Sequence, residues 1–94
     1  MERMVKRLEC SIHGRVQMVL FRDFAERKAK KLHITGTVKN EDDGTISIIA
    51  EGDEENLKEF LHYLRKGPVL SHVEKVEEVW KNPTGAFRFF SIIY

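Results

Sequence analysis

The residues best suited to chemistry lie close together in the segment Gly14-Arg15-Val16-Gln17-Met18-Val19-Leu20-Phe21-Arg22. An alternating apolar pattern, typical of a strand, precedes this segment, and a helical pattern begins about where it ends. A short loop between a strand and a helix leaves backbone N–H groups unpaired, and the helix dipole adds partial positive charge there. Because such a place attracts anions, the segment is a candidate site for a phosphate or a carboxylate.

Arg22 is the side chain in this segment that has two interpretations. It falls in the first turn of the predicted helix, where the helix dipole alone favours an acidic residue. A bound anion would reverse that preference, because a guanidinium group binds two oxygens at once. Arg22 is also one of sixteen Lys and Arg residues, most of which are expected to be solvated. Physical grounds leave both interpretations of Arg22 open, whereas for Arg15 they favour the solvated one.

Apolar spacing indicates the elements that must position the segment. A strand is predicted over residues 5–12, where alternate side chains are apolar: Leu8, Cys10 and Ile12. The helix after it has one apolar face, made of Phe21, Phe24, Ala25, Ala29 and Leu32. Residues 32–38 and 45–50 predict two more strands, and the intervening Asp43-Gly44 predicts that they form a hairpin.

The second half of the chain predicts a helix and one or two further strands. Asp53 is a candidate N-cap, and Lys66-Gly67-Pro68 is a typical helix end. The apolar face between them consists of Leu57, Phe60, Leu61 and Leu64. Imperfect alternation over residues 71–80 predicts a strand with a bulge or at a sheet edge. Residues 87–94 are apolar on both faces and predict a central strand.

These elements predict an α+β fold. The order is strand, helix, strand, strand, helix, strand, with residues 87–94 as either an extra strand or the last of the pattern. Two amphipathic helices would cover one face of an antiparallel sheet, which gives a ferredoxin-like βαββαβ sandwich. A chain of 94 residues is expected to form a single domain over residues 1–94.

Composition excludes several classes of function. The formal net charge of +1 is too small to favour nucleic acid or a membrane surface as a partner. The single cysteine, Cys10, has no internal disulfide partner, and neither a signal peptide nor a long apolar run is visible, so a cytoplasmic location is expected. The histidines lack zinc spacing. The acidic residues at 41–43 are adjacent, which suits a turn better than a calcium loop.

Four ordered motifs resemble the acylphosphatase family over nearly the whole chain. The first is the segment 14–22, which is similar to the family signature G-R-V-Q-G-V-x-F-R. The second is Gly36-Thr37-Val38-Lys39-Asn40, which is similar to G-x-V-x-N and is followed by the Asp-Gly hairpin. Gly67-Pro68 with Ser71-His72-Val73 resembles the family's Gly-Pro segment, and Phe90-Ser91-Ile92 resembles its C-terminal F-x-I.

The resemblance implies an enzyme that hydrolyses the carboxyl–phosphate bond of small acyl phosphates without a metal or organic cofactor. By the same resemblance, Arg22 binds the phosphate and Asn40 positions the attacking water. The phosphate oxygens would accept hydrogen bonds from the backbone of the loop residues Gly14, Arg15, Val16, Gln17, Met18, Val19 and Leu20. Without the family, Asn40 is better explained as a turn residue that bonds local backbone. We expect the enzyme to act as a monomer.

Met18 and Leu20 depart from the family pattern, which has glycine at the first position and often at the second. Glycine there permits a positive φ or a close approach to the anion. A left-handed Met18 would cost about 1–2 kcal/mol, which the fold can tolerate. The sequence leaves open a normal, a slow or an inactive enzyme, and the alternative is a module that binds phosphate or acyl phosphate without turnover. Single-stranded nucleic-acid binding ranks third, because the aromatic-glycine pattern of RNA-binding sheets is missing.

Overall fold

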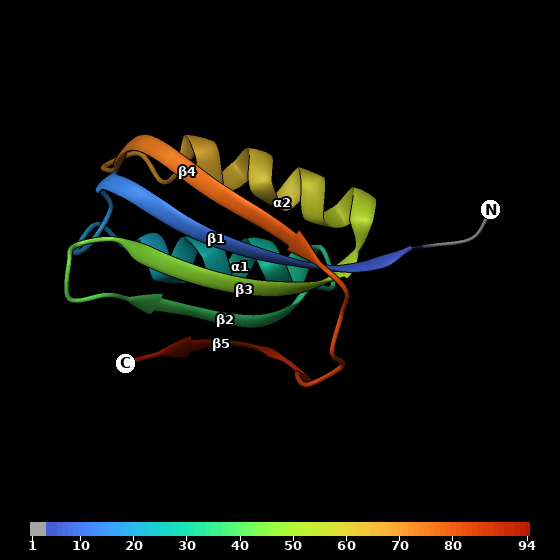
Figure 1. The fold of residues 1–94 in the computed structure, drawn as a ribbon. Coiled ribbons are helices and arrows are strands. Elements are labelled where there is room, and N and C mark those ends of the chain that lie inside the picture. The colour runs from blue at the N-terminus through green and yellow to red at the C-terminus, as the bar shows by residue number, and fades with distance from the viewer. Residues whose placement is uncertain (1–3) are drawn as a thin grey trace.

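The computed structural model describes residues 4–94, which contain two helices and five strands. In chain order they are β1 (Val5–Arg15), α1 (Phe21–Lys31), β2 (Thr35–Asn40), β3 (Ile46–Asp53), α2 (Glu54–Lys66), β4 (His72–Lys81) and β5 (Phe90–Ile93), as Figure 1 shows. The predicted sequence of elements is confirmed, and the segment near the C-terminus is an additional strand.

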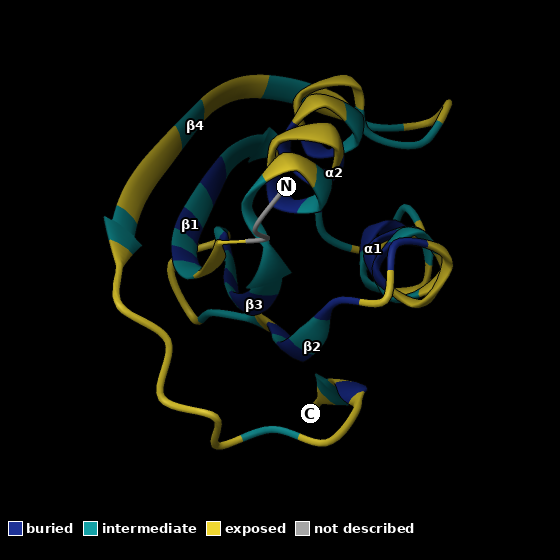
Figure 2. Ribbon diagram, turned by 90° about the vertical axis from the view of Figure 1, so that its right-hand side faces the viewer, coloured by how far each residue is buried: buried dark blue, intermediate teal, exposed yellow. Residues whose placement is uncertain are grey.

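The strands form one sheet in the order β4-β1-β3-β2-β5. Both helices lie on the same face of this sheet, with α2 against β1, β3 and β4 and α1 against β2 and β5 (Figure 2). The predicted ferredoxin-like α+β arrangement is therefore confirmed. The expectation of a purely antiparallel sheet is wrong, since β5 pairs with β2 in parallel while the other three pairings are antiparallel.

The prediction of a central strand over residues 87–94 is also wrong. Only Phe90–Ile93 forms β5, and this strand lies at the edge of the sheet beside β2. Phe90 is buried and packs against Phe60 of α2 with ring centroids 5.8 Å apart. Phe89 and Tyr94, in contrast, are 74% and 91% exposed. The apolar run misled the prediction because apolar side chains are often left at the surface.

The core lies between the sheet and the two helices. Alternate side chains of β1 enter it as predicted, and α1 contributes Phe21, Ala25 and Ala29, followed by Leu32. The α2 contribution is the predicted set of Leu57, Phe60, Leu61 and Leu64. Asp53 caps α2 by accepting a hydrogen bond from the backbone N–H of Glu55 at 3.0 Å. Neither helix within residues 4–94 has the length and apolar character needed to cross a membrane.

A bulge brings the end of β1 close to β4, which is an edge strand as predicted. His13 pairs with Lys75 but Gly14 pairs with Val73, so that β4 carries one additional residue between them. Gly14 has a φ of 127°, and a Cβ atom at this position would lie 2.1 Å from the carbonyl oxygen of His72. Glycine is therefore required where β1 enters the candidate loop.

Glu51 of β3 binds the connection from β4 to β5 on the face of the sheet that the helices do not cover. The Glu51 carboxylate accepts hydrogen bonds from the backbone N–H groups of Thr84 and Gly85 at 2.9 Å each, and it pairs with Arg7 at 2.9 Å. Burial alone would raise the pKa of Glu51, but these bonds, with one from the Thr84 hydroxyl, lower it to about 2. This contact fixes the path of the chain toward β5.

The turn between β2 and β3 accounts for two of the three acidic residues at 41–43. Asp43 accepts hydrogen bonds from the backbone N–H and the hydroxyl of Thr45 at 3.0 and 2.6 Å, and Glu41 accepts one from the Ser47 hydroxyl at 2.6 Å. These contacts close the hairpin around Asp43-Gly44, as the sequence predicted. The hairpin places Asn40, the last residue of β2, beside the loop that follows β1.

Candidate functional site

The loop between β1 and α1 has a backbone that alternates in handedness. Met18 and Leu20 have φ values of 61° and 63°, whereas Gln17 and Val19 keep negative φ. The left-handed geometry that glycine would favour is thus present at both positions where the chain carries a large side chain. Alternation of this kind turns successive N–H groups toward a common concavity, which is a known arrangement for anion binding.

The N–H groups of this loop are available to a ligand. Among residues 4–94, no carbonyl or side chain accepts a hydrogen bond from the backbone N–H groups of residues 16–20. Leu20 is the N-cap of α1, and its side chain provides no capping hydrogen bond. Unpaired N–H groups and the positive end of a helix dipole therefore meet at one point, where an anion is stabilised.

Packing explains how the loop is held. Val16 is buried and Val19 packs against the core, so the loop is anchored by its inward side chains. Met18 and Leu20 point outward and are 98% and 72% exposed. Because they are exposed, neither side chain fills the concavity formed by the backbone.

Arg22 lies on the first turn of α1, beside the loop. Its guanidinium carbon stands 4.9 Å from the ring centroid of Tyr94, a cation–π contact. The neighbouring acid, Asp23, forms an ion pair with Arg27 at 3.0 Å. Within residues 4–94 no carboxylate pairs with Arg22, so its charge is available to an anion at the loop.

Asn40 points to the same side of the sheet as α1. It pairs across the hairpin with Ile46, whose side chain is buried in the core, and directly opposed residues share one face of a sheet. Its side-chain oxygen, Oδ1, is buried and has no hydrogen-bond partner among the described residues. A buried polar atom without a partner costs free energy, so this amide oxygen is positioned to accept a hydrogen bond from water or a ligand.

Gln17 joins the loop to the hairpin that carries Asn40. Its side-chain Nε2 donates to the carbonyl oxygens of Glu41 at 2.8 Å and Thr45 at 2.9 Å. The sequence pattern points only to the backbone of Gln17 and does not predict this side-chain contact. An amide side chain directly after a buried apolar residue was the available signal, but its partners lie too far along the chain for any spacing rule to find.

Arg22, Asn40 and part of the loop surround a pocket of about 430 Å³. Its lining includes Arg22, Asn40, Val16, Met18 and Leu20 of the predicted site, together with Phe21, Asp23, Ile92 and Tyr94. Of the other predicted loop residues, Gly14, Arg15, Gln17 and Val19 are outside the lining, and Arg15 is exposed. The structure therefore brings Arg22 and Asn40 to one cavity, although they come from a helix and a strand.

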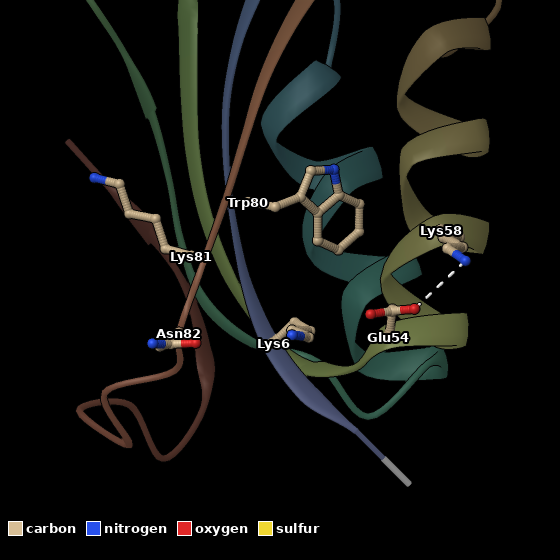
Figure 3. A pocket seen from close by; sticks show the side chains of 6 residues that line it. All are labelled: Lys6, Glu54, Lys58, Trp80, Lys81 and Asn82. Carbon is tan, nitrogen blue, oxygen red and sulfur yellow. Dashed lines mark ion pairs between the residues drawn. The ribbon is translucent and has the colours of Figure 1, made fainter.

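A second pocket, of about 450 Å³, lies near the start of β1 (Figure 3). Its lysines are mostly paired, because Lys58 forms an ion pair with Glu54 at 3.5 Å and Lys81 forms one with Glu9 at 3.0 Å. Trp80 forms part of the wall. The length of β1, about 30 Å, separates this pocket from the loop. It is therefore distinct from the site around Arg22.

Comparisons with known proteins agree with this geometry. The acylphosphatase family model matches residues 8–92. An acylphosphatase of an Arthrobacter species is 41% identical over 88 residues, which cover 94% of this chain and 81% of that protein. One of Thermus thermophilus is 44% identical over 79 residues, covering 84% of this chain and 90% of that protein. The crystal structure of acylphosphatase from Bacillus subtilis superposes with a TM-score of 0.92 at 35% identity, covering 95% of this chain and 99% of that one. Local geometry and overall similarity lead to one conclusion, that the chain belongs to the acylphosphatase family.

Proposed function

We propose that this protein hydrolyses acyl phosphates to a carboxylate and inorganic phosphate. The observation that carries the proposal is the buried, unpaired Oδ1 of Asn40 in the same pocket as Arg22. The amide oxygen of Asn40 is suited to bind a water molecule, and the guanidinium of Arg22 is suited to bind a phosphoryl group. Hydrolysis of an acyl phosphate needs few other catalytic groups, because the carboxylate is a good leaving group.

The phosphoryl group would occupy the concavity of the loop. Its oxygens accept hydrogen bonds from the backbone N–H groups of residues 16–20 and from the guanidinium of Arg22. These donors are fixed before the substrate arrives, so they stabilise charge on the phosphoryl oxygens without having to reorganise. Gln17 keeps the loop at a constant distance from the hairpin through its two bonds to Glu41 and Thr45.

The attacking water would donate one hydrogen bond to Oδ1 of Asn40. Its oxygen forms a bond to phosphorus as the bond between phosphorus and the carboxyl oxygen breaks. The proton that the water loses passes to a phosphoryl oxygen, so that Asn40 orients the water and need not take a proton. Catalysis then consists of positioning and electrostatic stabilisation, as is usual for phosphoryl transfer.

The test is hydrolysis of benzoyl phosphate by the wild type, Arg22→Ala and Asn40→Ala. We expect each substitution to lower kcat/KM by about 100- to 1000-fold, since each removes a preorganised polar group from the transition state. Arg65→Ala and Asn82→Ala are matched controls, because the first changes an exposed arginine of α2 and the second an exposed asparagine, and both lie outside this pocket. Equal rates in all five proteins would contradict the proposal.

The alternative is a module that binds acyl phosphate without turning it over. The observation that favours it is the left-handed φ of Met18 and Leu20, because a strained loop shifts more easily and a small shift of the phosphate costs more in rate than in binding. Inorganic phosphate that protects the wild type against thermal unfolding, with no hydrolysis of benzoyl phosphate, would favour this module over the enzyme.

We also propose that the protein works as a cytoplasmic monomer on small-molecule acyl phosphates. Cys10 is a free cysteine, and burial raises the pKa of its thiol to about 12. Such a thiol remains protonated and buried, so it does not join two copies of the chain through a disulfide, which supports a monomer. Size-exclusion chromatography under reducing conditions, with the monomer mass expected, tests the oligomeric part.

A further inference from the structure

Three large apolar side chains are exposed at the mouth of the pocket that holds Arg22 and Asn40. Met18 is 98% exposed, Leu20 is 72% exposed and Tyr94 is 91% exposed, and all three belong to its lining. Exposed apolar side chains that gather at one place on a monomer often mark a binding surface. Core packing does not account for them, because they leave most of their surface in water.

The backbone at this rim has a conformation that is unusual for residues with large side chains. Met18 and Leu20 both have left-handed φ, a region that large side chains rarely adopt and that glycine adopts freely. Strain of this kind is concentrated at ligand-binding sites. Tyr94 is positioned by Arg22, because the guanidinium carbon of Arg22 lies 4.9 Å from the centroid of the Tyr94 ring.

The proposed reaction indicates which part of the substrate meets this rim. In an in-line displacement the leaving group departs opposite the attacking water. The water site is next to Oδ1 of Asn40, an atom that is buried, whereas the three apolar side chains are exposed. With the phosphoryl group in the loop between them, the acyl group is directed away from Asn40 and toward the opening.

We propose that Met18, Leu20 and Tyr94 form an apolar acyl subsite, so that the enzyme favours acyl phosphates with an apolar chain of several carbons over acetyl phosphate. This inference rests on the proposed function and adds a substrate class to it. Met18 and Leu20 would thus serve two purposes, since their N–H groups face the phosphate and their side chains contact the acyl group.

The experiment compares kcat/KM for hexanoyl phosphate and acetyl phosphate. The two carboxylate leaving groups are nearly equally basic, so the ratio reports binding of the additional methylene groups rather than chemical reactivity. We expect a ratio of roughly 15 in the wild type, because each buried methylene contributes about a factor of four and about two would be buried. In Met18→Asn/Leu20→Asn the ratio should fall to about 2, since the subsite has lost its apolar surface.

Asparagine is chosen because it tolerates left-handed φ, so that the loop keeps its backbone conformation. Val69→Asn is the matched control, as Val69 is 99% exposed and lies outside the pocket, and its ratio should equal that of the wild type. A wild-type ratio near 1, or an unchanged ratio in the double variant, overturns the acyl subsite while leaving the proposed function intact. No hydrolysis of either substrate overturns the proposed function and the subsite together.

Discussion

Replacing Met18 with glycine should stabilise the protein, although it removes a large apolar side chain. The backbone φ of Met18 is 61°, and a left-handed residue with a Cβ costs about 1–2 kcal/mol. The side chain of Met18 is 98% exposed, so removing it loses almost no buried apolar surface. Against this gain, the greater freedom of glycine in the unfolded chain costs about 0.5–1 kcal/mol. We expect a net increase of about 0.7 kcal/mol in the free energy of unfolding.

Chemical unfolding measures this difference, with the fluorescence of Trp80 as the signal. Trp80 is the single tryptophan of the chain and is half-buried in β4, so it reports on loss of the fold. The expected increase in Tm is roughly 3–6 °C for a domain of this size. Met18→Ala is the matched control, because alanine removes the same exposed atoms but keeps the Cβ that causes the strain.

The two substitutions separate backbone strain from the side chain. We expect Met18→Ala to unfold with the wild-type midpoint and Met18→Gly alone to gain stability. An equal gain in both would assign the effect to the exposed side chain, and a loss in Met18→Gly would refute the strain argument. Glycine should also raise kcat on acetyl phosphate by up to about threefold, since about 0.7 kcal/mol then favours the binding conformation of the loop.

Two further predictions concern contacts that hold the site and the sheet. Gln17→Met removes both bonds to the β2–β3 turn, so kcat for benzoyl phosphate should fall about 10- to 100-fold; an unchanged kcat would show that the loop keeps its place without Gln17. The pKa of Glu51 is about 2 in the folded protein and 4.5 ordinarily. The free energy of unfolding should therefore fall by about 3 kcal/mol as the pH drops from about 5 to 2; urea unfolding at several pH values should show a smaller fall in Glu51→Gln.

Local patterns were sufficient to predict most of the elements. The alternation of Leu8, Cys10 and Ile12 and the apolar faces of the two helices follow directly from which side chains meet the core. Caps and turns were equally predictable, because Asp53 and Asp43 bond backbone atoms only two residues away. Short-range chemistry of this kind is contained in the sequence around each residue.

The errors arose where position in the sheet depends on distant contacts. Residues 87–94 are mostly apolar, and nothing in that composition distinguishes a central strand from a parallel edge strand. The path to the edge is set by Glu51, which binds Thr84 and Gly85 more than thirty residues away. Burial of Phe90 against Phe60 then fixes β5 beside β2. Neither contact produces a periodicity that sequence inspection can detect.

Motifs in the sequence indicate the residues of the site, but only the folded chain brings these residues together. Arg22 and Asn40 were selected from the motifs, but their roles require that a helix start and a strand end meet at one pocket. Gln17 supplies that connection, since it bonds the turn immediately after Asn40. A shift of the loop relative to the hairpin would change the angle between phosphate and water, on which in-line attack depends. The amide of Gln17 is therefore a positioning group of the site, although it would not touch the substrate.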